Sequence, residues 1–97
     1  MRRPQTVLIV DDQEINRAAL EVILGNDYDV ITADNGVRAL ELMRSHINEI
    51  SIVMLDLMMP VMNGYEVLKT IREEEELRNL PVIVMTSYKE AEVDALG

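Results

Sequence analysis

Short apolar runs rich in β-branched residues alternate with longer amphipathic segments along the chain. Three of these runs are apolar on both alternating faces, as strands are when both sides of a parallel sheet are covered. One further run is more polar and suits the edge of a sheet. The pattern therefore predicts four strands, over residues 6–10, 29–32, 51–55 and 81–85, with 29–32 at an edge.

The segments between the runs have the spacing of helices with one apolar stripe. Gly25 marks the expected end of the first helix, and the dipeptides Asn35-Gly36 and Asn63-Gly64 indicate turns that lead into the next two. The three predicted stripes consist of Ile15, Ala18, Ala19, Val22 and Ile23, then Val37, Leu40, Met43 and Ile47, and finally Val67, Leu68 and Ile71.

A fourth helix is expected at the end of the chain, where Ser87 and Glu90 have the spacing of a capping box and the helix would run to about Gly97. Strands and helices thus alternate throughout. Because crossovers between parallel strands are right-handed, this order predicts an α/β fold with a doubly wound parallel sheet and helices on its faces. At 97 residues, the chain has the length of one domain.

Charge and composition narrow the possible functions. The 9 Lys and Arg against 18 Asp and Glu give a net charge of −9, which argues against direct nucleic-acid binding and is compatible with binding a cation. The absence of cysteine excludes disulfides, thiolate zinc sites and a cysteine nucleophile. The apolar run after Arg2 and Arg3 stops at Asp11, too short for a signal peptide, and no run approaches a membrane span, so we expect a cytoplasmic protein.

Polar residues follow three of the predicted strands, at the edge where open α/β sheets bind their ligands. Asp11 and Asp12 follow the first strand, Asp56 follows the third, and Thr86 follows the fourth. Because the carboxyl ends of parallel strands meet at the same edge, we expect three carboxylates and a hydroxyl to face one crevice.

Taken singly, most of these residues have simpler explanations. Asp12 could be the N-cap of the first helix, Asp11 could share that role, and Thr86 could merely end a strand. Asp56 lies between apolar residues, so its carboxylate needs a cation or hydrogen-bond donors, or else it must be protonated. Three neighbouring carboxylates also repel one another, which favours a divalent cation, and oxygen ligands alone favour Mg²⁺.

Together, these residues resemble the receiver domain of bacterial two-component response regulators. An acidic pair, an Asp-x-x-x-Pro-x-x-x-Gly stretch and a Thr occur in the family's order and at its spacing, within residues 7–12, 53–64 and 82–87, and the resemblance covers the whole chain. By this resemblance, the fold is flavodoxin-like, with the four βα repeats present arranged in the strand order 2-1-3-4.

The resemblance also implies roles for individual residues. Asp56 would be the phosphoacceptor for a sensor histidine kinase, and Asp11 and Asp12 would hold Mg²⁺, or Mn²⁺, together with Asp56. The backbone carbonyl of Met58 would complete the protein ligands of the metal. Thr86 would form a hydrogen bond to the phosphoryl group and act as the switch. We also predict slow self-hydrolysis of the acyl phosphate, because the thioether of Met58 cannot orient a water.

These roles describe a phosphoacceptor switch in a two-component phosphorelay, which takes part in its own phosphoryl transfer but is not otherwise an enzyme. Its expected partners are the kinase and an output domain or effector outside this chain, with no direct contact to nucleic acid or membrane. One alternative is a pseudo-receiver that acts as a scaffold and never carries phosphate. Another is a phosphatase with Asp56 as nucleophile, although Met58 stands where a general acid would be useful.

The family has five βα units, whereas the pattern here contains four. The lysine that pairs with the phosphoryl group in the family would fall outside this sequence. We therefore expect residues 1–97 to be a receiver domain that is incomplete at its C-terminal end and has no output domain. The fourth strand would then be an open edge through which the chain could self-associate.

Overall fold

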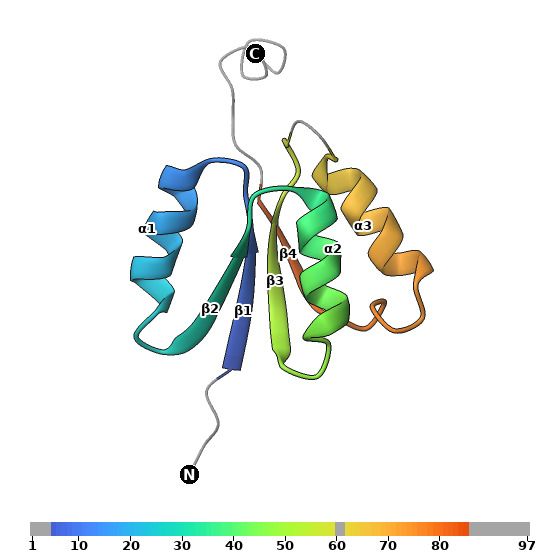
Figure 1. Ribbon diagram of the computed structural model, residues 1–97, viewed down its shortest axis with the longest axis horizontal. Coiled ribbons are helices and arrows are strands. Elements are labelled where there is room, and N and C mark those ends of the chain that lie inside the picture. The colour runs from blue at the N-terminus through green and yellow to red at the C-terminus, as the bar shows by residue number, and fades with distance from the viewer. Residues whose placement is uncertain (1–4, 60–61, 86–97) are drawn as a thin grey trace.

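Four parallel strands form one sheet in the computed structural model, which describes residues 5–59 and 62–85 (Figure 1). Their spatial order is β2-β1-β3-β4, which confirms the predicted order. The more polar run is β2, and it lies at an edge as predicted. The strands are β1 (Gln5–Val10), β2 (Tyr28–Ala33), β3 (Ile50–Asp56) and β4 (Val82–Met85).

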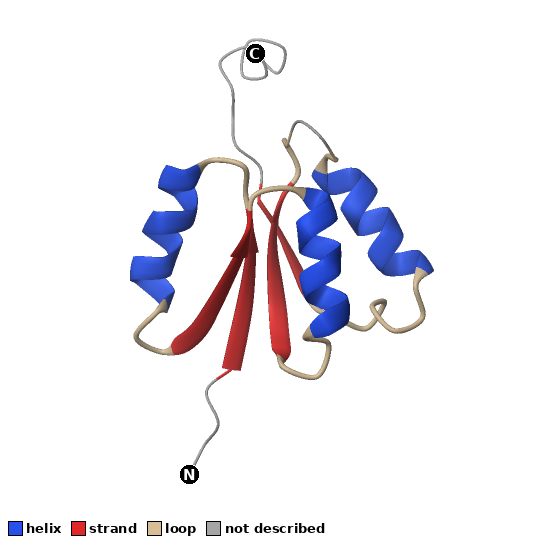
Figure 2. Cartoon of the chain, in the orientation of Figure 1, coloured by secondary structure: helices blue, strands red, loops and turns tan. Residues whose placement is uncertain are grey.

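Three helices connect the strands: α1 (Glu14–Leu24), α2 (Gly36–Ser45) and α3 (Gly64–Glu73). Figure 2 shows α1 to one side of the sheet and α2 with α3 to the other, as right-handed crossovers require when the strand order reverses after β2. None of the helices in the described ranges is both long and apolar enough to cross a bilayer. The predicted fourth helix, over residues 87–97, lies outside the described residues.

The predicted turns set the starts of two helices. The side chain of Asn35 accepts a hydrogen bond from the backbone N–H of Arg38 at 2.8 Å, and that of Asn63 accepts one from Glu66 at 3.0 Å. Each asparagine therefore satisfies a backbone donor that a helix leaves unpaired in its first turn. Gly25 ends α1, again as predicted.

The hydrophobic core lies between the sheet and the pair α2 and α3. Alternate residues of β1 point to opposite faces, so Leu8 and Val10 belong to this core while Val7 and Ile9 are buried on the side of α1. The core residues with the least exposure, apart from those of β1, are Ala39 and Met43 of α2, Val53 and Leu55 of β3, Val67 and Ile71 of α3, and Leu77.

The first helix differs from the prediction. The stripe expected to face the sheet is exposed, with Ile15 at 77%, Val22 at 78% and Ile23 at 68% exposure, and α1 has no fully buried residue. Its half-buried apolar side chains are Leu20 and Leu24. A helical period identifies an apolar face but not the element that covers it. Here α1 contacts β1 and β2 at the sheet edge, and the predicted stripe points elsewhere.

The second stripe is only partly correct. Leu40 and Met43 are buried, but Val37 is 52% exposed, and Ile47 lies beyond the end of α2. Ala39 takes the place of Val37 in the buried face of the helix. The structure thus rotates the buried face of α2 relative to the predicted stripe.

Candidate metal centre

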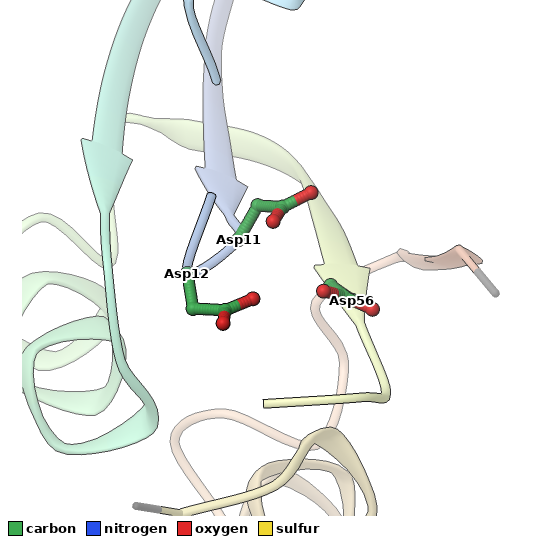
Figure 3. Close-up of side chains that lie close together, drawn as sticks. All are labelled: Asp11, Asp12 and Asp56. Carbon is green, nitrogen blue, oxygen red and sulfur yellow. The ribbon is translucent and has the colours of Figure 1, made fainter. Parts of the chain in front are cut away.

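Three aspartates converge at the carboxyl end of the sheet (Figure 3). Asp11 and Asp12 directly follow β1, and Asp56 is the last residue of β3. Because Val10 pairs with Leu55 between these neighbouring strands, the residues that follow the pair lie side by side. One carboxylate oxygen from each aspartate lies within 4.8 Å of the other two. The predicted convergence of the three carboxylates is therefore confirmed.

Asp11 is buried and held at three points. Its backbone N–H donates to the carbonyl of Ala33 on β2 at 3.1 Å, and its Oδ1 accepts from the N–H of Gln13 at 2.9 Å. Its own carbonyl accepts from Nη1 of Arg17 at 2.8 Å. The loop between β1 and α1 is therefore fixed at Asp11 by hydrogen bonds to β2 and from α1.

Asp12 does not cap the first helix. The N-cap position of α1 is occupied by Gln13, and no side chain forms the cap hydrogen bond there. The side chain of Asp11 accepts a hydrogen bond from the N–H of Gln13, which is the N-cap residue itself. The capping explanation of Asp12 is therefore wrong, and its half-buried carboxylate is directed toward Asp11 and Asp56 instead.

Asp56 is 5% exposed, and this burial raises the pKa of its carboxyl group. The N–H of Met58 donates to its Oδ1 at 3.0 Å and partly opposes that shift in pKa. The charges of Asp11 and Asp12 raise the pKa further. The ionised form of Asp56 thus lacks a compensating cation within the described part of the chain, and a bound metal ion would supply one.

The start of α3 packs directly against the backbone of Asp56. Gly64 donates its N–H to the carbonyl of Leu57 at 3.0 Å. A Cβ atom at Gly64 would lie 2.4 Å from the backbone oxygen of Asp56 and 2.5 Å from Cα of Leu57, far inside van der Waals contact. Only glycine lets the helix approach the strand end this closely.

The donor set fits Mg²⁺. Oxygens bound to one Mg²⁺ ion lie at most about 4.2 Å apart, because each Mg–O distance is about 2.1 Å. Carboxylate oxygens within 4.8 Å of one another therefore need only a small movement to share such an ion. All three donors are hard oxygens, and neither His nor Cys contributes to the cluster.

Comparison with known proteins agrees with this geometry. A family model described as the response regulator receiver domain matches residues 7–96. The chain belongs to the receiver-domain family. It is therefore a phosphoacceptor module of the response-regulator type and not a classical enzyme, as predicted.

Curated relatives of this receiver domain occur in plants and bacteria. It is 44% identical over 85 residues to the two-component response regulator ORR11 of Oryza sativa subsp. japonica, covering 87% of this chain and 57% of that protein. It is 35% identical over 86 residues to the polar-differentiation response regulator DivK of Brucella anthropi, covering 88% of this chain and 68% of that protein. The chain thus spans less than two thirds of the length of the rice relative.

Solved structures share the receiver fold. The CheX-CheY-BeF3-Mg+2 complex from Borrelia burgdorferi contains a chain that is 34% identical, with a TM-score of 0.78, covering 94% of this chain and 69% of that one. The Mn(2+)-bound form of response regulator Rcp1 is 28% identical, with a TM-score of 0.76, covering 95% of this chain and 73% of that one. Relatives with this fold have therefore been crystallised with either divalent ion.

The roles predicted for Met58 and Thr86 remain predictions. Met58 lies directly beside the receiver's acidic cluster, where its N–H contacts Asp56. Thr86 lies outside the described residues, although Met85 before it pairs with Asp56 across β3 and β4. Nothing in the sequence singles out Arg17, because a hydrogen bond from a helix back to a loop carbonyl six residues earlier leaves no periodic pattern.

Proposed function

We propose that this receiver domain accepts a phosphoryl group on Asp56 from a sensor histidine kinase, with Mg²⁺ held by Asp11, Asp12 and Asp56. The observation that carries the proposal is the buried carboxylate of Asp56, which has two further carboxylates within 4.8 Å at the carboxyl end of the sheet. When bound, the metal would screen the negative charge of the incoming phosphoryl group.

Asp56 is the nucleophile in this proposal. Its Oδ1 accepts the N–H of Met58, which orients the carboxyl group and leaves Oδ2 to attack phosphorus. A bond forms between Oδ2 and phosphorus while the bond between phosphorus and the kinase imidazole nitrogen breaks, and the imidazole keeps the electron pair and takes up a proton. The product is an acyl phosphate on Asp56.

Two further residues complete the proposed site. The backbone carbonyl of Met58 is an additional metal ligand, which is supported by its place two residues after Asp56 and by the N–H contact that fixes this turn. The hydroxyl of Thr86 donates to a phosphoryl oxygen and acts as the switch. Its support is the pairing of Asp56 with Met85, the residue that precedes it.

The partners of this reaction are a histidine kinase and an output domain or effector protein, and the proposed location is the cytoplasm. Mn²⁺ is a second metal that the oxygen ligands would accept. The net charge of −9 supports a partner other than nucleic acid.

The test is the intact mass of the protein after incubation with Mg²⁺ and a small acyl-phosphate donor. We expect the gain of one phosphoryl group, which is lost in Asp56→Asn and in a sample treated with a chelator. Asp34→Asn is a matched control, since Asp34 is an exposed aspartate just after β2 at the same edge of the sheet. An unmodified parent protein that still binds Mg²⁺ would instead favour a pseudo-receiver.

A further inference from the structure

Arg17 ties helix α1 back to the acidic loop. It is the fourth residue of α1, and its backbone N–H donates to the carbonyl of Gln13 at 3.2 Å. Its side chain reaches back further, so that Nη1 donates to the carbonyl of Asp11 at 2.8 Å. Within the described ranges, Arg17 makes no ion pair, although its side chain is half-buried.

The bond from Arg17 fixes the peptide group that joins the two acidic residues. A peptide group is planar, so holding the carbonyl of Asp11 also sets the direction in which the chain enters Asp12. The carboxylate of Asp12 accepts no hydrogen bond from the part of the chain that the structure describes. Its position in the cluster therefore depends on the backbone before it, whereas Asp11 and Asp56 have bonds of their own.

The effect of Arg17 is one of geometry rather than of charge. The guanidinium donates to a neutral carbonyl and not to a carboxylate of the cluster. If charge alone mattered, removal of Arg17 would make the site more negative and would tighten the binding of a cation.

We propose that Arg17 is a positioning residue, whose hydrogen bond to the carbonyl of Asp11 holds Asp11 and Asp12 at the spacing that a small divalent cation requires. The inference rests on the proposed function, since it assumes that the three aspartates bind Mg²⁺. A positioning role and a charge effect have opposite signs. Loss of the bond therefore weakens Mg²⁺ binding even though a positive charge is removed.

The experiment compares Arg17→Met with the parent protein. Mg²⁺ and Ca²⁺ are titrated separately, and the dissociation constants are read from the amide NMR signals of Asp12 and Gln13. The matched control is Arg38→Met, which removes the same charge from an exposed arginine of α2 that pairs with Glu41. We expect Arg17→Met to bind Mg²⁺ about 10-fold more weakly, as is typical when a residue that supports a metal ligand is lost.

Metal selectivity separates positioning from a general loss of structure. Mg²⁺ requires nearly ideal octahedral geometry, whereas Ca²⁺ tolerates irregular sites. We therefore expect Arg17→Met to weaken Mg²⁺ binding more than Ca²⁺ binding. Arg17→Lys keeps a donor nitrogen and should restore part of the Mg²⁺ affinity. Arg38→Met should match the parent for both ions.

Each other outcome counts against a defined claim. Equal Mg²⁺ affinities in Arg17→Met and Arg38→Met, or equal weakening for both ions, would overturn the positioning role and leave the proposed function intact. A parent protein that binds no Mg²⁺ would overturn the proposed metal site and this inference with it. If Arg17→Met does not fold, Arg17→Lys must bind Mg²⁺ more tightly than Arg17→Gln, and equal affinities of those two variants would overturn the inference.

Discussion

Replacing Asp56 by Asn should stabilise the metal-free protein at neutral pH. Asp56 is 5% exposed and lies with two other carboxylates whose oxygens are within 4.8 Å, so folding brings three negative charges together. Asparagine keeps an oxygen that can accept the N–H of Met58 and removes the charge. The substitution therefore relieves repulsion and desolvation with little change in shape.

The size of the gain follows from the spacing of the charges. Two unit charges at this separation repel by about 0.9 kcal/mol in bulk water and by about 3.5 kcal/mol at an effective dielectric constant of 20. Asp12 is half-buried and is screened more than Asp11. We expect a net gain of about 1–3 kcal/mol, since a pair near the surface lies between these limits. In a domain of this size, that gain corresponds to a rise in Tm of roughly 5–15 °C.

The gain should depend on pH with a defined sign. Because the pKa of Asp56 is raised in the folded protein, its proton binds more tightly there than in the unfolded chain. The stabilisation that protonated Asp56 contributes is complete below the pKa of the unfolded chain and is lost as the pH rises through the folded pKa. The advantage of Asp56→Asn should thus be small near pH 4 and should grow toward neutral pH.

The assay is thermal unfolding of both proteins, monitored by circular dichroism from pH 4 to pH 8 in buffer that contains a chelator. Added Mg²⁺ should stabilise the parent by about 1.4 kcal/mol at ten times its Kd and should stabilise Asp56→Asn much less. Equal Tm values of the two proteins in chelator at neutral pH, or a less stable variant, would contradict repulsion among the three carboxylates.

Two further predictions concern the surroundings of the site, and a third concerns the ion pair between Arg44 at the end of α2 and Glu74 just after α3. Gly64→Ala should lower the free energy of unfolding by about 1–3 kcal/mol through overpacking against Asp56, and it should impair phosphorylation. Urea unfolding and intact mass test these two effects. Unchanged stability would contradict the close approach of α3 to the end of β3. Met58→Asn should speed the loss of the phosphoryl group, because an amide can orient a water, and an unchanged rate of phosphate release would contradict this role. The pKa of Glu74 is lowered by its hydrogen bonds from Arg44, so its stabilising contribution is present above the unfolded pKa and is lost as the pH falls through the folded pKa. Glu74→Gln should therefore be less stable than the parent at pH 7 but not near pH 3 in urea unfolding at low salt, and equal stability at pH 7 would count against the pair.

Much of the fold and of the site could be predicted, because the apolar runs define the strands and the site residues directly follow the ends of those strands. The apolar runs identified all four strands to within one residue at each end, and the polar run was placed at the sheet edge where β2 lies. Parallel strands end at one edge, so Asp11, Asp12 and Asp56 had to converge once β1 and β3 were neighbours.

Contacts between elements were harder to predict. The stripe predicted for α1 does not cover the sheet, since Ile15, Val22 and Ile23 are exposed. Periodicity does not say which element covers a face. A capping role for Asp12 is wrong, because α1 begins at Glu14 and its N-cap residue is Gln13. The bond from Arg17 to Asp11 depends on the fold of the loop and has no counterpart in the spacing of residues.

The central claim is that the phosphoryl group resides on Asp56, and chemical trapping tests it most directly. Reduction of an aspartyl phosphate with borohydride converts that residue to homoserine, which peptide mass spectrometry can locate along the chain. After incubation with Mg²⁺ and a phosphoryl donor, the account predicts homoserine at position 56, with Asp11 and Asp12 unmodified. Homoserine at position 11 or 12, or a phosphorylated protein with no reducible aspartate, would contradict it.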